Sequence, residues 1–160
     1  MALDGATLQM VSHGLVTGAL FFLVGMLQER AHSREMDDFG GLLGRVPWLG
    51  WTFILSAFAS LGLPGLAHFP AEFQIFLATL KVQPWAIIAI LAIVVTAGLY
   101  LRAIARVFLG APNDKWSAMP DLDRGELLAI LPLVILTILI GIAPSTLIDM
   151  IHATMASLNF

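Results

Sequence analysis

Four long apolar blocks constrain this chain more than any other feature of its sequence. A helix needs about 20 apolar residues to cross the hydrocarbon core of a bilayer, and each block meets that length. Composition agrees, because 59% of the 160 residues are hydrophobic and only 12% are charged, about half the charged share of an ordinary soluble domain. We therefore expect an all-α polytopic membrane protein in which residues 1–160 form a single transmembrane domain. The blocks lie at 6–28, 48–80, 85–109 and 126–144.

The second block is too long for one straight crossing and contains several helix breakers. Its 33 residues would extend about 50 Å as one helix, against a hydrocarbon core of about 30 Å. Pro64 lacks a backbone N–H and clashes with a preceding helical turn, and Gly62 and Gly65 weaken a helix. Pro70 suits the first turn of a new helix. The pattern predicts a discontinuous second crossing, made of a helix at 48–63, an irregular link at 64–69 and a helix at 70–80.

The tail at residues 145–160 follows Pro144 and is less apolar than the four blocks. Leu147 and Ile151 alternate with Asp149 and His152 at helical spacing. A short helix that lies at the membrane interface or docks on the other helices fits this pattern better than a fifth crossing.

The charged residues predict an orientation. With four crossings, the loops at 29–47 and 110–125 share one side of the membrane with the adjacent helix ends. Seven of the eight Lys and Arg residues lie there, and only Lys81 lies on the other side. Basic residues favour the cytoplasmic side, so we expect cytoplasmic loops and both termini on the outer side. The seven are Arg30, Arg34, Arg45, Arg102, Arg106, Lys115 and Arg124.

The sequence also excludes several kinds of site. The chain has no cysteine, so it holds no disulfide, thiolate metal site or iron–sulfur cluster of its own. The net charge of -3 includes no basic field of the kind that binds nucleic acid.

Glu72 is the only acidic residue well inside an apolar block. It lies near the start of the predicted helix at 70–80, where free backbone N–H groups favour negative charge. Burial in the hydrocarbon region favours the neutral carboxyl group, whereas a nearby cation or water favours the carboxylate. These opposing effects suit a group that binds and releases a proton. The alternative is a permanently protonated side chain that bonds to backbone groups freed by the break.

A polar stripe runs along the first block. Gln9, His13 and Thr17 are spaced by four residues, which places them on one helical face. Ser12 lies beside them, and His13 lies at about the same depth as Glu72. A stripe of this kind faces protein or water rather than lipid. Because imidazole accepts a proton on one nitrogen and donates one from the other, His13 is a candidate relay; a plain hydrogen bond to a neighbouring helix is the alternative.

His68 lies within the predicted link, four residues before Glu72. It either extends a proton path or bonds to carbonyl groups that the break frees. The spacing of His13, His68 and Glu72 matches no compact metal-ligand motif. We therefore expect proton transfer by Glu72, His13 and His68, with no metal-binding or cofactor-binding residue.

Three short runs in fixed order carry a family resemblance. They are S-H-G-L at 12–15, E-R-x-H-S-R at 29–34 and L-P-G followed by E-F within 63–73. Over essentially all its residues, the chain resembles the antiporter-like chain 4 (M-type) subunits of proton-pumping NADH:quinone oxidoreductase, respiratory complex I. The ending from Glu126 to Leu158 is similar to the C-terminus of these subunits.

This resemblance implies both a fold and residue roles. The family has two inverted five-helix repeats, each with one broken helix, and this chain resembles only the last four helices. The resemblance implies that Glu72 is the broken-helix residue of the proton path and that His13 is the relay histidine of the preceding helix. The family's first repeat holds a glutamate–lysine pair, and a further lysine lies on the family's central axis. None of these residues has a counterpart here, so the resemblance implies that the chain alone is not a complete pump.

Four positions depart from the family pattern. Pro70 and Ala71 replace a small Val-Gly-like pair, and the proline should stiffen the start of its helix. Gln28 stands where tyrosine is common. His68 stands where a small polar residue is more usual, so it either adds a proton site or marks a divergent member.

The expected function is that of a proton-translocating membrane subunit of a complex I-like NADH:quinone oxidoreductase, with no redox chemistry on this chain. NADH, flavin, iron–sulfur clusters and quinone are expected on partner subunits. The other expected partner is the lipid bilayer, and the expected location is the bacterial inner membrane. Two alternatives stay open: a subunit of a cation/proton antiporter or membrane-bound hydrogenase complex, and a purely structural membrane subunit.

Overall fold

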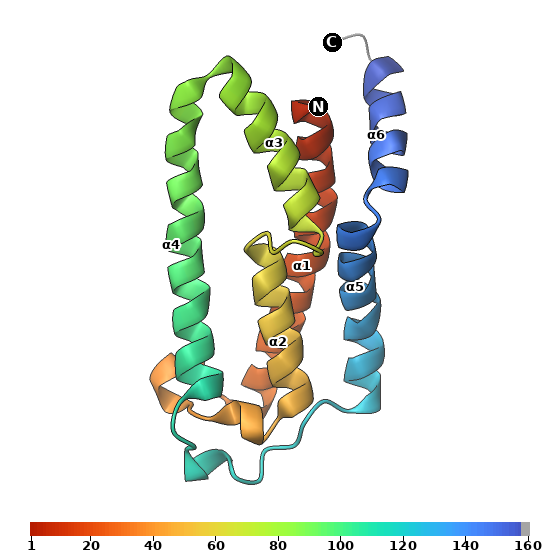
Figure 1. Ribbon diagram of the computed structural model, residues 1–160. Helices are drawn as coiled ribbons and strands as arrows, with labels where there is room; N and C mark the ends of the chain where they lie inside the picture. Colours follow the sequence, from red (N-terminus) through yellow and green to blue (C-terminus); the bar gives the residue numbers. More distant parts are fainter. Residues whose placement is uncertain (158–160) are drawn as a thin grey trace.

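The computed structural model describes residues 1–157, and every regular element in that range is helical. The all-α class predicted from the sequence is therefore confirmed. Six α-helices run along the long axis of the molecule (Figure 1). They are α1 Ala2–Ala31, α2 Pro47–Ser60, α3 His68–Val82, α4 Ile87–Ala103, α5 Arg124–Ile142 and α6 Ser145–Ser157. Short helical turns complete the fold at Met36–Asp38, Leu42–Gly44, Pro84–Ala86, Ile104–Leu109 and Asp114–Trp116.

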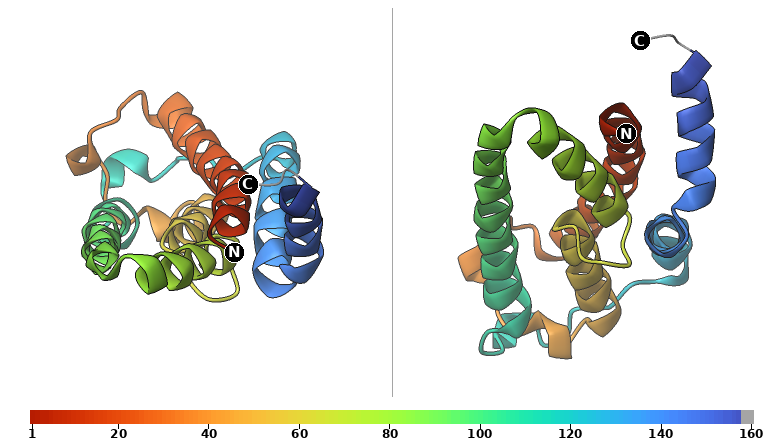
Figure 2. Two further views of the ribbon diagram at one scale, coloured as in Figure 1. Left: turned by 90° about the horizontal axis from the view of Figure 1, so that it is seen from above. Right: turned by 45° about the horizontal axis from the view of Figure 1, so that its top comes forward.

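Helix α1 is the centre of the assembly. It contacts α2, α3, α5 and α6, and the view from above shows it between the α2–α3 pair and the α5–α6 pair (Figure 2). The main apolar core joins Leu23 of α1, Phe108 at the end of the α4 segment and Ile130 of α5, all of which are buried. A polar side chain on α1 therefore lies close to several other elements.

Three helical segments of the described residues are long and apolar enough to cross a membrane: Ala2–Ala31, Pro84–Leu109 and Arg124–Ile142. The second predicted crossing corresponds to α2 and α3, which have 14 and 15 residues and follow one another along the long axis (Figure 1). Each is too short to cross alone. The discontinuous helix is thus present, and the total of four crossings stays a prediction.

The break begins earlier than the sequence predicted. We expected the first half to end at residue 63, but α2 ends at Ser60. Gly62 has a left-handed φ of 70° and its N–H donates to the Ala59 carbonyl at 3.2 Å, while the Leu63 N–H donates to the Phe58 carbonyl at 3.1 Å. These two bonds form a Schellman motif, which ends a helix at a glycine.

Helix α3 also begins earlier than predicted, at His68 rather than at residue 70. The link therefore spans 61–67 instead of 64–69, and Pro70 lies within the first turn of α3, where its missing N–H removes no helical bond. His68 is part of the helix and not of the link.

Two neighbouring helices hold the link. From α1, the Ser12 hydroxyl donates to the Ala67 carbonyl at 3.0 Å. From α5, Gly141 lies so close to the backbone of Gly65 and Leu66 that a side chain at this position would overlap them. The link is thus packed between α1 and α5, as irregular backbone at membrane depth requires.

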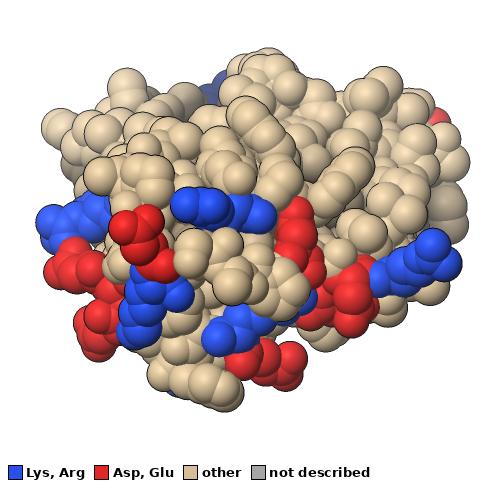
Figure 3. Space-filling view, turned by 90° about the horizontal axis from the view of Figure 1, so that it is seen from below, with Lys and Arg blue, Asp and Glu red and all other residues tan. Residues whose placement is uncertain are grey.

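Charged side chains gather at one end of the molecule, as Figure 3 shows from below. The loops at 32–46 and 110–123 meet at this end, and the N-terminus and the end of α6 lie at the other (Figure 1). The Arg30 guanidinium donates to both carboxylate oxygens of Glu126 and to the carbonyls of Pro120 and Asp121. This fork ties α1 to the start of α5. Which side of the membrane this end faces stays a prediction.

Two other predicted boundaries also shift for local reasons. Helix α5 begins at Arg124, two residues before the predicted start, because Asp123 and Glu126 form a capping box. The predicted tail is the helix α6, in which Ile151 packs against Leu8. This packing fits the docking role proposed for the tail, whereas its placement at the interface stays a prediction and residues 158–160 lie outside the described range.

The geometry of the break predicts an effect for Gly62→Ala. An alanine there adopts a left-handed conformation that costs about 1–2 kcal/mol, and its Cβ overlaps Oε2 of Glu72. We expect a lower melting temperature of the purified protein in detergent. Gly44→Ala is the matched control, because a Cβ added at Gly44 meets no atom within 4 Å and its φ is not positive. Equal melting temperatures for the two variants would contradict this account of the break.

Candidate functional site

The structure brings the three predicted site residues together beside the break. His13 comes from the middle of α1, and His68 and Glu72 come from the first turns of α3. The His13 and His68 rings are stacked, with centroids 6.1 Å apart and planes 15° from parallel. Nδ1 of His68 lies 4.0 Å from Oε1 of Glu72. The three side chains therefore form a continuous series in which His68 is the middle member.

The hydrogen bonds of His68 define its neutral tautomer. Its Nδ1 lies 3.3 Å from the carbonyl oxygen of Ser60, and a carbonyl oxygen only accepts hydrogen bonds. Nδ1 must therefore carry the proton, which leaves Nε2 as an acceptor in the neutral ring. Nε2 is buried and has no hydrogen-bond partner among the described residues. The buried imidazole thus has one donor held by a carbonyl and one acceptor that makes no hydrogen bond with the described residues.

His13 has a different environment. Its ring is exposed in the described chain and lies beside the Thr17 hydroxyl, with Oγ1 3.3 Å from Nδ1. His13 is 11 positions after Ala2, about 17 Å along the helix, which corresponds to mid-membrane depth. An imidazole at this depth is costly against lipid, so its exposed face requires water or a further protein surface.

Glu72 is half-buried and packs against the break. Its carboxylate lies where the Cβ of any residue other than glycine at position 62 would be. The side-chain amide of Gln9 on α1 lies beside the Glu72 carboxylate. A cavity of about 420 Å³ between α3 and α4 also reaches Glu72. Glu72 thus borders His68 on one side and a cavity on the other.

Two features differ from what the sequence suggested. Lys81, the one basic residue predicted on the same side of the membrane as the end of this helix, is in the last turn of α3 and makes no ion pair with Glu72 in the described structure. Ser60 and Tyr100 were not predicted, yet the Ser60 hydroxyl donates to the Tyr100 hydroxyl at 3.0 Å. Tyr100 is the only tyrosine of the chain and lies within an apolar block, which is the signal that sequence reasoning overlooked.

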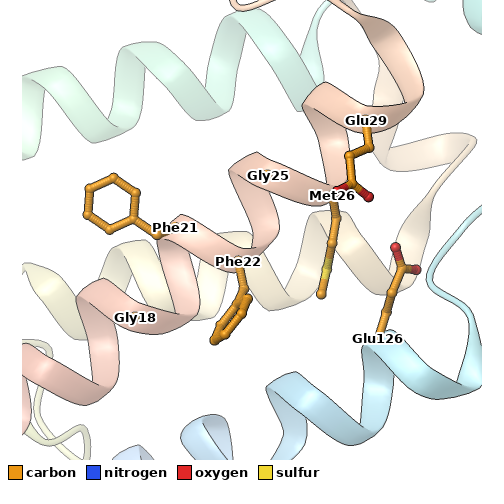
Figure 4. Close-up of a pocket in the computed structure, with 7 residues that line it drawn as sticks. All are labelled: Gly18, Phe21, Phe22, Gly25, Met26, Glu29 and Glu126. Carbon is orange, nitrogen blue, oxygen red and sulfur yellow. The ribbon is translucent and has the colours of Figure 1, made fainter.

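A separate cavity of about 560 Å³ lies between α1 and α5, near the charged end. Figure 4 shows Glu29 and Glu126 at one end of this cavity and Phe21 and Phe22 farther along α1. Because Glu126 is bound by Arg30 and none of the three predicted site residues lines the cavity, this space is not part of the candidate site. Among residues 1–157, no group of three or more His, Asp or Glu residues is placed to hold a metal ion.

Comparisons with known proteins identify related chains. The family described as "NADH:quinone oxidoreductase/Mrp antiporter, TM" matches residues 1–110. NADH-quinone oxidoreductase subunit M of Pseudomonas aeruginosa is 40% identical over 156 residues, which cover 97% of this chain and 30% of that protein. The subunit M of Escherichia coli is 33% identical over 162 residues, covering 99% of this chain and 32% of its own length.

A relative with a different electron donor in its name also matches. The F(420)H(2) dehydrogenase subunit M of Methanosarcina mazei is 36% identical over 151 residues, which cover 94% of this chain and 30% of that protein. The chain therefore spans about a third of the length of these relatives. Because the family match covers more than half of its residues, this chain belongs to the NADH:quinone oxidoreductase/Mrp antiporter transmembrane family.

Proposed function

We propose that this chain is part of a proton-translocating membrane subunit of an NADH:quinone oxidoreductase, and that it carries protons past the broken helix. The observation that carries this proposal is the series His13, His68 and Glu72, which spans α1 and α3 beside unwound backbone at membrane depth. Ionisable groups are rare at this depth and mark ion and proton paths.

The proposed proton transfer follows from the tautomer of His68. A proton that reaches Nε2 from the side of His13 converts the ring to imidazolium. Release of the other proton from Nδ1 toward Glu72 leaves a neutral ring with its proton on Nε2. The cycle closes when the remaining proton moves from Nε2 to Nδ1 of the same ring, with water as its carrier, so that one proton in total has passed to Glu72. The Ser60 carbonyl favours this tautomer because it only accepts hydrogen bonds. The 4.0 Å between Nδ1 and the carboxylate requires a small side-chain movement or a bridging water for each transfer.

The names of the relatives support a separation between proton transport on this chain and electron-transfer chemistry on other subunits. Their names include both NADH-quinone oxidoreductase and F(420)H(2) dehydrogenase, so similar membrane chains accompany different electron donors. We propose that the NADH, flavin, iron–sulfur and quinone chemistry belongs to partner subunits, and that this chain contacts other membrane subunits of the assembly in the bacterial inner membrane. In the proposed orientation, the charged end lies in the cytoplasm and both termini lie outside.

A second candidate function is cation/proton antiport, which is favoured by the antiporter half of the matching family description. Sodium-dependent transport without NADH oxidation would support it over the first.

Glu72→Gln tests the central step. The amide keeps the size of the side chain but does not exchange a proton, so we expect proton translocation to fall at least tenfold while the assembled complex is recovered in normal amount. Translocation is measured as acidification of inverted membrane vesicles per NADH oxidised. The control is Glu35→Gln, which removes an exposed carboxylate at the charged end. Normal translocation by the Glu72 variant would refute the proposal.

His68→Asn tests whether His68 transfers protons or only bonds to the backbone carbonyl of Ser60. An asparagine amide nitrogen reaches roughly the position of Nδ1 and donates to the Ser60 carbonyl, but it does not take up a proton. We expect assembly and melting temperature close to those of the original chain, with translocation severalfold lower and an altered dependence on pH. If His68→Asn translocates normally and only His68→Ala is impaired, His68 serves the backbone alone.

A further inference from the structure

Gln9 is a residue of the polar stripe on α1 that the proposed proton path does not use. Its side-chain oxygen Oε1 is buried and has no hydrogen-bond partner among the described residues. Most buried polar atoms in native proteins are paired, and leaving one unpaired costs free energy. An apolar side chain would fill the same space without this cost. The amide of Gln9 therefore needs an explanation other than packing.

The packing of α1 against α3 pairs Gln9 with Glu72. The two helices run antiparallel (Figure 1), and their contacts follow one order: Gly5 with Gln74, Leu8 with Ala71, Ser12 with Ala67, and His13 with His68. Gln9 lies one turn before His13, and Glu72 lies one turn after His68. The two residues therefore meet one turn away from the stacked histidines, where the Gln9 amide lies beside the Glu72 carboxylate.

The close approach of the two helices fixes this pair. Glycine allows helix backbones in a membrane to approach closely, and a Cβ added at Gly5 would lie only 3.0 Å from the Ala71 carbonyl oxygen and 3.0 Å from the Cβ of Gln74. On the other side of Gln9, the hydroxyl of Ser12 bonds to the backbone of the link. Because both sides are held, the amide has little freedom to move away from the carboxylate.

The Gln9 amide interacts differently with the two protonation states of Glu72. An ionised carboxylate only accepts hydrogen bonds, and the amide NH₂ group is a donor. A hydrogen bond to an ionised group is roughly twice as strong as one between neutral groups. Because the amide is neutral at every working pH, Gln9 stabilises the ionised form of Glu72 without carrying a proton itself.

The other neighbours of Glu72 do not supply such a donor. Nδ1 of His68 lies 4.0 Å away and its hydrogen is directed to the Ser60 carbonyl, and His13 lies beyond His68. Towards α2 and α4, the cavity of about 420 Å³ that borders Glu72 has no other charged side chain among the described residues of its lining. Gln9 is thus the neutral donor placed beside the carboxylate.

We propose that Gln9 is a positioning residue for Glu72, and that its amide holds the ionised carboxylate beside His68 more strongly than it holds the protonated carboxyl group. Uptake of a proton from His68 then loosens Glu72 from α1, and the neutral carboxyl group is free to move toward the cavity between α3 and α4. This inference rests on the proposed function for the proton that Glu72 carries, whereas the hydrogen bond itself is measured without turnover.

Gln9→Met replaces the amide with an apolar side chain of the same length. In the assembled complex without turnover, the ionisation of Glu72 is followed against pH through the infrared band of its protonated carboxyl group, identified as the band that is absent from Glu72→Gln. Loss of a hydrogen bond to the ionised form should raise the pH of half-ionisation by about one unit or more. The melting temperature should be unchanged or higher, because the buried unpaired oxygen is gone.

Translocation by Gln9→Met provides the functional readout. A carboxyl group that ionises less readily also releases its proton less readily, so we expect translocation per NADH oxidised to fall severalfold at neutral pH and to recover as the pH is raised. A residue that only joined α1 to α3 would lower the melting temperature or the yield of assembled complex and would leave the dependence on pH unchanged. That result would overturn the positioning role.

Gln74→Met is the matched control. Gln74 lies on the same contact between helices, but its amide donates to the Pro70 carbonyl of its own helix at 3.2 Å. We expect Glu72 to ionise in this variant at the same pH as in the original chain. If the shift in Gln9→Met is no larger than that in Gln74→Met, the inference is wrong.

Gln9→Asn is a second variant for the case in which Gln9→Met does not assemble. It keeps the amide but withdraws it from the carboxylate by one methylene group. A rise in the pH of half-ionisation supports the inference, and an unchanged value overturns it.

These outcomes are distinct from failure of the proposed function. If Glu72→Gln abolishes translocation but Gln9→Met leaves the ionisation of Glu72 unchanged, the proton path stands and the role of Gln9 is wrong. If Gln9→Met shifts the ionisation but Glu72→Gln translocates normally, Gln9 holds Glu72 as proposed and the role of Glu72 in transport is wrong.

Discussion

The rest of the structure depends on how the backbone groups of the broken helix are satisfied. In the hydrocarbon region no water replaces a missing helical bond, so each freed carbonyl needs a protein partner. The Ser60 carbonyl accepts from His68, and the Ala67 carbonyl accepts from Ser12. The absence of a side chain at Gly141 lets α5 lie directly on the link. These contacts fix where α1, α3 and α5 stand relative to one another, and hence which side chains meet beside the break.

The same interactions also orient the side chains of the proposed proton path. By accepting from Nδ1, the Ser60 carbonyl leaves the buried Nε2 of His68 as an acceptor that makes no hydrogen bond with the described residues. Glu72 lies against Gly62, at the glycine that ends α2. The two roles that the sequence left open for His68, backbone cap and proton relay, are therefore compatible in one side chain. The bond to the Ser60 carbonyl holds the ring in the orientation that the proposed relay needs.

Much of the site was predictable from the sequence, because each residue has a local signal. Glu72 is a lone carboxylate in an apolar block, and His13 belongs to a polar stripe with helical spacing. The sequence contained the signal for the earlier end of α2, because a glycine followed two residues later by a proline commonly ends a helix, but the predicted boundary at residue 63 placed Gly62 inside the helix. Contacts between distant segments were also missed. The fork between Arg30 and Glu126 joins residues 96 positions apart, and the bond from Ser60 to Tyr100 spans 40, so neither leaves a pattern within one helix.

The central claim is that Glu72 changes its protonation state during turnover, as a proton carrier must. Infrared difference spectroscopy of the assembled complex, recorded with and without turnover, measures this directly through the carbonyl stretch of a protonated carboxyl group. The account predicts a carboxyl band that appears or disappears with turnover and is absent from the spectrum of Glu72→Gln. A Glu72 carboxyl band that stays constant across the working pH range and during turnover would show a permanently protonated structural residue, and would contradict the account.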